Sequence, residues 1–306
     1  MLFAGATISG SQGYFGGFLL SKVDEDLDEN WSLIIHPQRP WWDFHLMDLW
    51  RYRYLVKVFV KRDFISKFKQ TLLGPLWHII NPVISTVIFT IIFGQIARLP
   101  TDGIPPFLFY MTGTTVWNYF AACLNGTSNT FVANAGLFGK VYFPRLAVPI
   151  SVVISELASF AIRFVIMLGF LIYFLLSGSD IHPNIWILSF PALLIIMAGM
   201  GLGLGIIVSS LTTKYRDLQI LVSYGVSLLM YATPVIYPLS SVPQNWRWFI
   251  FANPMTPIIE TFRYALLGAG TVSPAALLYS AGFTLGVLLT GIFIFNRVEA
   301  TFMDTV

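Results

Sequence analysis

Glu156 and Arg163 are two ionisable residues inside a long apolar stretch, Leu146 to Ser179, that carries no other charge. Charged side chains are costly inside a membrane, where they commonly line a pathway or pair with another charge. The two residues are seven positions apart, so they share a helix face but stand about 10 Å apart along its axis, which is too far for a direct ion pair. The sequence gives them no second acid, no histidine and no metal-binding spacing. We therefore expect them to be structural or pathway-lining rather than catalytic.

Two glycine-containing segments could suggest nucleotide binding. In Asn134 to Val141, NAGLFGKV, an asparagine stands where a phosphate loop needs its first glycine, and a valine stands where it needs a Ser or Thr for Mg²⁺. The segment Gly199 to Gly205, GMGLGLG, lies within an apolar stretch without a preceding strand. Small residues in that setting let helices pack closely. We therefore expect a chain that binds no cofactor itself and has no ATPase site of its own.

Composition indicates a membrane protein. The chain has 306 residues, of which 56% are hydrophobic and 11% are charged, whereas a soluble domain carries about 25% charged residues. A water-soluble core of this length cannot bury so many apolar side chains, but a bilayer can. The net charge of +3 does not indicate a nucleic-acid partner, because the basic residues gather at one end of the chain and in short loops, as membrane topology places them.

Six stretches with few or no charges are long enough to cross a bilayer, which takes about 20 apolar residues. This pattern predicts an all-α polytopic membrane protein with six transmembrane helices per protomer and a transmembrane domain over residues 74–306. The expected spans are about 75–97, 105–124, 146–177, 184–212, 217–238 and 274–296.

Lysine and arginine predict the orientation, because they concentrate in cytoplasmic loops. Fourteen of them precede the first span, follow the second or fourth span, or belong to the C-terminal tail, and three lie on the opposite side. With six spans, we expect a multi-pass protein of the bacterial cytoplasmic (inner) membrane with both termini in the cytoplasm.

The region before the first span divides into two parts. Residues 1–42 begin glycine-rich and then become acidic, and we expect a flexible tail of unassigned purpose. Residues 43–73 are rich in Lys and Arg, and Val58, Ile65 and Leu72 fall on one helical face. This pattern predicts an amphipathic interface helix on the cytoplasmic surface, near anionic lipid or a partner protein. A solvated basic helix is the alternative.

The segment 242–268 is too apolar for an ordinary loop and too rich in Pro and Asn to span a membrane. Irregular backbone at membrane depth is tolerated where protein or a cavity surrounds it. We expect two short re-entrant periplasmic helices before the last span, with an interfacial aromatic belt as the alternative.

Polar and aromatic residues share a helix face in three of the expected spans. Sugars stack on aromatic rings while their hydroxyls bond polar groups, so such faces could line a channel for a glycan. Ordinary contacts between helices explain the pattern equally well. The candidates are Asn81 and Ser85 in the first span, Tyr110 and Trp117 in the second, and Tyr224, Ser227 and Tyr231 in the fifth.

Several motifs, in order along the chain from about residue 44 to the C-terminus, resemble the permease subunits of the second class of bacterial ABC exporters, above all those that export O-antigen, teichoic acid or capsule. The motifs are RDFISKFKQTLLGPLW (62–77), FGKVYFPRLAVP (138–149), KYRDL (214–218), TPVIYPL (233–239), NPMTPIIETFRYALLG (253–268) and the tail VEATFMDTV.

The resemblance implies a homodimer that works with two copies of a separate cytoplasmic ATPase subunit, which binds ATP and Mg²⁺. It also implies that the interface helix and a coupling helix within 134–145 meet the ATPase, and that the loop TLLGPLW lies at the pore entrance. The expected ATPase-coupling residues are Lys57, Lys61, Arg62, Asn134, Lys140 and Arg145, and the expected pore-entrance residues are Leu73, Gly74 and Pro75.

The function that we expect is half of a channel for export of undecaprenyl-pyrophosphate-linked polysaccharide, similar to O-antigen, from cytoplasm to periplasm. The basic side chains of the interface helix would suit the pyrophosphate. Two alternatives remain open at this point: an ABC permease for a smaller solute or drug, and a polytopic membrane transferase that acts on polyprenyl lipids.

Overall fold

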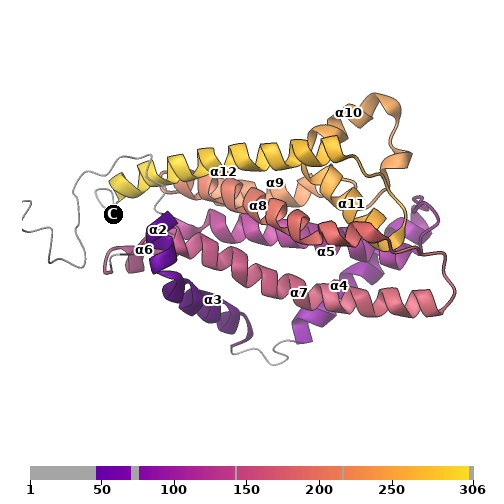
Figure 1. Ribbon diagram of the computed structural model, residues 1–306, viewed down its shortest axis with the longest axis horizontal. Coiled ribbons are helices and arrows are strands. Elements are labelled where there is room, and N and C mark those ends of the chain that lie inside the picture. The colour runs from indigo at the N-terminus through magenta and orange to yellow at the C-terminus, as the bar shows by residue number, and fades with distance from the viewer. Residues whose placement is uncertain (1–45, 70–75, 142, 216, 303–306) are drawn as a thin grey trace, which may run out of the picture. The chain divides into compact units, whose positions relative to one another are not determined.

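The computed structural model describes residues 46–69, 76–141, 143–215 and 217–302. The expected tail and the expected pore-entrance residues Leu73, Gly74 and Pro75 lie outside these ranges. Throughout the described residues every regular element is a helix, which confirms the all-α class there (Figure 1).

The helices follow one another in chain order as α2 (Leu46–Arg51), α3 (Arg53–Phe68), α4 (Trp77–Phe89), the π-helix η2 (Thr90–Ile96), α5 (Pro106–Ser128), α6 (Thr130–Phe138), α7 (Ala147–Leu176), η3 (Ile185–Ser189), α8 (Phe190–Thr212), α9 (Asp217–Leu229), η4 (Leu239–Ser241), α10 (Gln244–Ala252), α11 (Met255–Leu267) and α12 (Pro274–Phe302).

Four helical segments in the described ranges are long and apolar enough to cross a membrane: Trp77–Ile96, Ala147–Leu176, Ile185–Thr212 and Pro274–Glu299. They match the first, third, fourth and sixth expected spans. The second and fifth expected spans correspond to α5, which is long but less apolar, and to α9, which has 13 residues. A multi-pass membrane protein is therefore supported, and the full set of six spans stays a prediction.

Helix α5 is the central element of the bundle. It packs against α4, α7, α8, α9 and α11, and most of its side chains are buried, Leu108 and Thr115 among them. Because protein rather than lipid surrounds it, α5 can carry threonines whose hydroxyls bond its own carbonyls, as Thr114 does to Tyr110 at 2.8 Å. This environment explains why its composition is less apolar than that of the other long helices.

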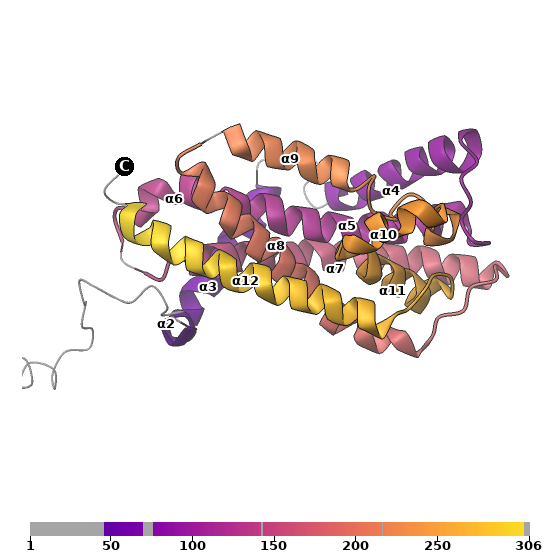
Figure 2. The same cartoon turned by 90° about the horizontal axis from the view of Figure 1, so that it is seen from above.

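The glycines of α8 place it directly against two neighbouring helices. A Cβ atom on Gly201 would lie 2.6 Å from Cys123 of α5, and one on Gly203 would lie 2.9 Å from the backbone of Leu288 on α12. Successive glycines therefore serve opposite sides of the helix, and α8 lies between α5 and α12 (Figure 2). These contacts support helix packing as the role of the segment Gly199 to Gly205.

The segment expected to be re-entrant contains two short helices, α10 and α11. The backbone turns between them at Asn253, whose side-chain oxygen accepts a hydrogen bond of 3.0 Å from the N–H of Met255. Helix α11 ends at Gly268, which has a φ of +78°, a left-handed conformation that glycine adopts without strain. The two short helices match the expectation, and their insertion into a membrane stays a prediction.

The expected interface helix is divided into α2 and α3 near Tyr52. Its protein-facing side differs from the expected apolar face, because Val58 and Ile65 are exposed, at 44% and 47%, while Val56 and Phe59 are buried. The side of α3 that contacts protein thus contains Val56 and Phe59. One and two turns later it contains the half-buried polar residues Asp63 and Lys67.

Candidate functional site

An ion pair joins α3 to α7. The Nζ atom of Lys67 donates to Glu156 Oε1 at 2.7 Å and to Ser159 Oγ at 3.2 Å. One turn earlier on α3, Asp63 Oδ2 accepts from Ser151 Oγ at 3.4 Å. Because successive turns of α3 meet successive turns of α7, α3 lies along the first half of α7. Movement of α3 is thereby linked directly to a candidate membrane span.

Phenylalanines join the first turns of α3 to the rest of the same end of the bundle. The Phe59 ring meets Phe143 edge-on at 5.6 Å between centroids. Phe131 of α6 stacks on Phe295 of α12 at 4.5 Å. All four belong to one buried apolar cluster, which we call the α6 cluster and which also contains Val56, Phe138, Leu146, Ala147, Val148 and Ile206. It connects α3, α6 and the C-terminal part of α12 through side-chain packing.

The six expected coupling residues all belong to this end of the bundle but differ in surroundings. Lys57, Lys61 and Lys140 are exposed. Arg145 instead donates from Nη1 to the carbonyl of Glu299 at 2.8 Å, with its Nε 3.6 Å from the Glu299 carboxylate. Lys140 is therefore exposed on the segment after α6. Arg145, later in the same segment, holds that segment against α12.

The other two expected coupling residues, Arg62 and Asn134, line a polar cleft of about 470 Å³ among α3, α5, α6, α7 and the start of α9. Arg62 is paired with its neighbour Asp63 at 2.8 Å. Asn134 donates to the carbonyl of Thr130 at 3.0 Å. The lining also includes Ser66, Asn125, Asn129 and Gln219, so the cleft is suited to hydrogen bonding with a polar molecule or a partner protein.

A second polar site lies at the opposite end of the bundle, around Arg263 of α11. Its guanidinium is fully buried, donates to Glu260 at 3.0 Å, and donates to the carbonyls of Pro234 and Val235 at 3.0 and 3.2 Å. The ring of Phe109 lies 3.8 Å from its carbon Cζ. One side chain thus fixes α11 to α5 and to the irregular chain that follows α9.

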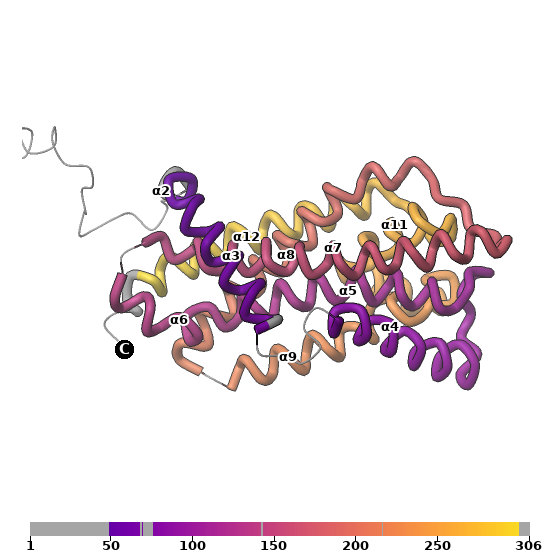
Figure 3. The backbone as a smooth tube through the Cα atoms, turned by 90° about the horizontal axis from the view of Figure 1, so that it is seen from below, coloured from indigo at the N-terminus to yellow at the C-terminus, as the bar shows by residue number. Residues whose placement is uncertain are grey.

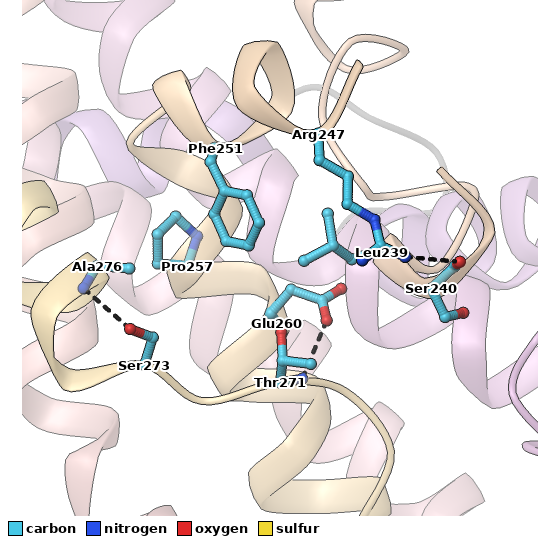
Figure 4. A pocket seen from close by; sticks show the side chains of 9 residues that line it. All are labelled: Leu239, Ser240, Arg247, Phe251, Pro257, Glu260, Thr271, Ser273 and Ala276. Carbon is cyan, nitrogen blue, oxygen red and sulfur yellow. Dashed lines mark hydrogen bonds between the residues drawn. The ribbon is translucent and has the colours of Figure 1, made fainter. Parts of the chain in front are cut away.

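Glu260 also faces a cavity of about 350 Å³ among α10, α11 and the start of α12 (Figure 4). Its second carboxylate oxygen accepts from the backbone N–H of Thr271 at 3.2 Å. Burial raises the pKa of the Glu260 carboxyl, while the charge of Arg263 and the Thr271 N–H favour its ionised form. Arg247 lines the same cavity and is held by the carbonyls of Val242 and Ser240.

The expected channel-lining residues fall into two groups. Tyr224 and Tyr231 are exposed, at 70% and 53%, and Asn81, Ser85 and Ser227 are exposed as well. In contrast, Tyr110 and Trp117 are buried inside the bundle, at 0% and 2%. A polymer at the surface of the protomer would not contact these two side chains, so their burial gives the channel assignment no support.

The ion pairs of Lys67 and Arg263 were not predicted from the sequence. For Arg263 a signal was present, because Glu260 and Arg263 are three residues apart within an otherwise uncharged helix, a spacing that brings side chains together. For Lys67 the partner is 89 positions away in sequence. Glu156 had been singled out, and its partner is on α3 rather than on its own helix.

Comparison with known proteins identifies the family. Residues 54–267 match the model of the ABC-2 type transporter family. The O-antigen export system permease protein RfbA of Klebsiella pneumoniae is 30% identical over 253 residues, which cover 82% of this chain and 94% of that protein. RfbA of Myxococcus xanthus is 29% identical over 219 residues, covering 71% and 81%. The polysialic acid transport protein KpsM of Escherichia coli is 24% identical over 255 residues, covering 82% and 95%.

The match spans α3 to α11 and therefore includes both polar sites. It agrees with the apolar helices and with the resemblance seen in the sequence motifs. The chain belongs to the ABC-2 type transporter family.

Proposed function

We propose that the chain is the membrane half of an exporter that moves undecaprenyl-pyrophosphate-linked polysaccharide, similar to O-antigen, from the cytoplasm to the periplasm. Two copies would form the channel, and two copies of a separate ATPase subunit would bind ATP and Mg²⁺ and supply the energy. The relatives named for O-antigen export and polysialic acid transport support this cargo class.

The face formed by α4 and α9 supports the channel between two copies. Both helices lie on the same side of α5 (Figures 2 and 3), and each has a single buried residue, Thr86 in α4 and Val226 in α9. Tyr224 and Leu228 of α9 are exposed, and so is Tyr231, two residues after the helix ends. Exposed tyrosines on an otherwise apolar helix suit a surface that packs against a second copy at some positions and contacts sugar at others.

The α6 cluster supports the transmission of force from the ATPase. A push on α6 would reach α3 through Phe138 and Phe59, and α3 would pass it to α7 through Lys67. This route needs the orientation in which both termini, α3 and α6 are cytoplasmic, and in which α10 and α11 lie on the periplasmic side as re-entrant helices. In that orientation the chain crosses the membrane six times. Helix α5 is the second span, and the chain from α9 to residue 238 is the fifth.

Cells that lack the gene, with and without a plasmid copy, provide the test. Surface glycan is measured beside lipid-linked glycan inside the cell. We expect surface polymer to disappear and long lipid-linked polymer to accumulate in the cytoplasm, and the plasmid to reverse both effects. Absence of any lipid-linked polymer would indicate a transferase instead, and unchanged glycan in both places would indicate a smaller cargo.

A further inference from the structure

The cavity among α10, α11 and the start of α12 has the size of a small-molecule site. Its volume of about 350 Å³ lies within the range of about 300–1,000 Å³ that is typical of such sites. Part of its wall is apolar, with the ring of Phe251 opposite the side chain of Leu239 (Figure 4). Small-molecule sites combine an apolar wall with a few placed polar groups, so the polar side chains decide what this cavity can bind.

Glu260 provides a hydrogen-bond acceptor in the cavity wall. Its carboxylate is 2% exposed and accepts from Arg263 Nη1 at 3.0 Å and from the N–H of Thr271 at 3.2 Å. The backbone of Leu239 donates a third hydrogen bond. An ionised carboxylate accepts about four hydrogen bonds, so about one position remains open. Because Glu260 lines the cavity, a hydroxyl group of a ligand can occupy that position.

Arg247 provides hydrogen-bond donors to the same cavity. Its Nε donates to the carbonyl of Val242 at 3.1 Å, and its Nη2 donates to the carbonyl of Ser240 at 3.4 Å. A guanidinium has five N–H groups, so the remaining ones have no partner among the described residues. The two carbonyls already hold the side chain in place, which lowers the entropy lost when a ligand binds to it. The cavity thus presents a fixed donor and a fixed acceptor.

The charges around the cavity balance. Among the side chains that line it or bond directly to its lining, Glu260 is paired with Arg263. The charge of Arg247 is offset by Asp102, whose Oδ1 accepts from Ser240 Oγ at 2.7 Å. A phosphate or a metal cation would therefore gain little net attraction there. A neutral sugar fits better, because its ring presents C–H groups to an aromatic side chain and hydroxyl groups to donors and acceptors.

We propose that this cavity binds a neutral sugar unit, with the sugar ring against Phe251 and its hydroxyl groups bonded to Arg247 and Glu260. The inference rests on the proposed function, in which α10 and α11 lie on the periplasmic side. The sugar would then belong to the polymer as it leaves the channel. A polymer held outside slips back less readily, and the few neutral contacts still let each sugar unit leave again.

The test is binding of a lipid-free oligosaccharide, released by mild acid from the surface polymer of the same cells. The protein is the full-length chain in nanodiscs, in the assembly in which it is extracted from membranes, and a titration followed by saturation-transfer NMR gives the affinity. Arg247→Gln should lower the affinity about tenfold, because a charged donor is lost. Phe251→Leu should lower it about fivefold, because the flat ring is lost.

Two matched variants are the controls. Arg98→Gln removes an exposed charge outside the helices. Phe249→Leu changes a phenylalanine of the same helix that is 49% exposed and does not line the cavity. Both should bind the oligosaccharide as the wild type does. All four variants should keep the wild-type melting temperature, which separates a loss of binding from a loss of folding.

Equal affinity of the wild type, Arg247→Gln and Phe251→Leu would overturn the sugar site. A wild type that binds no oligosaccharide, in cells whose surface polymer disappears with the gene, would also overturn it, and in both cases glycan export would stand. Native mass spectrometry adds a third outcome: a phospholipid lost from both cavity variants but retained by Phe249→Leu would identify a bilayer lipid as the occupant instead. Unchanged surface glycan in cells that lack the gene would contradict the proposed function itself.

Discussion

Lys67 Nζ lies 2.7 Å from Glu156 Oε1 and joins the last turn of α3 to the tenth residue of the helical span that begins at Ala147. The two side chains are 28% and 14% exposed, so the pair is shielded from water and is not a loose surface contact. It is the shortest charged connection that the described residues provide between α3 and a candidate span.

We expect Lys67→Ala and Glu156→Gln each to lower the free energy of unfolding by about 1–3 kcal/mol, because each leaves one partner of a charged hydrogen bond without the other. Both should reduce export, since α3 would move without α7. Thermal unfolding of the purified protein and surface glycan are the two measurements. Lys57→Ala, on the exposed side of the same helix, is the control and should leave stability unchanged. Restoration of both properties by the exchange Lys67→Glu with Glu156→Lys would support a direct pair.

Arg263→Met should be more damaging than any substitution on the surface. It leaves Glu260 charged and 2% exposed, and breaking a buried ion pair costs about 3–5 kcal/mol. It also leaves the carbonyls of Pro234 and Val235 without their donor. Expression and melting temperature measure the effect, with Arg247→Gln as the exposed control. A variant as stable as the wild type would show that α11 is held by packing alone.

Gly201→Val should disrupt the contact between α8 and α5, because even its Cβ atom would lie 2.6 Å from Cys123. Overpacking of this kind typically costs about 1–3 kcal/mol. Gly282→Val adds the same atoms to an open face of α12 and should change stability little. Comparison of the two melting temperatures decides whether close approach, rather than helix propensity, explains the glycines of α8.

Lys140 and Arg145 should separate coupling from stability. Lys140→Glu reverses an exposed charge and should reduce ATP-driven transport with no loss of stability, if this surface meets the ATPase. Arg145→Ala should lower stability, because it removes the bond to Glu299. The readouts are melting temperature for stability, and surface glycan together with ATPase activity of the assembled complex for coupled transport. Unchanged transport in Lys140→Glu would remove this lysine from the coupling surface.

Tyr224→Ala and Tyr231→Ala should reduce the amount or length of exported polymer with little change in stability, because both side chains are exposed. Tyr110→Phe should leave export intact, since its hydroxyl is buried and has no hydrogen-bond partner among the described residues. The electrophoretic length distribution of surface glycan distinguishes them. Loss of export in Tyr110→Phe alone would place the pathway inside the protomer.

The apolar helices were the most predictable part of the fold, because length and composition alone decide whether a helix can cross a bilayer. The expected spans 146–177 and 184–212 differ from α7 and from the segment Ile185–Thr212 by only a residue or so at each end. The pairing of α10 with α11 was also predictable, from the prolines and asparagines that punctuate the segment.

The partners of individual side chains were not predictable, because they depend on contacts between distant segments. Val58 and Ile65 are as apolar as Val56 and Phe59, and nothing in the sequence of α3 says which pair faces protein. Tyr110 shares a helix face with polar residues, as a channel residue would, but it is buried inside the bundle. Arg263 has an obvious partner in Glu260, whereas its two carbonyl partners lie 28 and 29 residues earlier.

The alternating glycines of α8 separate a closely packed group of helices, α5, α8 and α12, from the less buried helices α4 and α9. With α5 against one side and α12 against the other, α8 cannot turn about its axis without driving side chains into a neighbouring backbone. These three helices are therefore expected to form a rigid unit. Helices α4 and α9 each have one buried residue, so packing within the described part of the protomer restrains them less. Any conformational change during a transport cycle is therefore expected to move α4 and α9, while α5, α8 and α12 keep their relative positions.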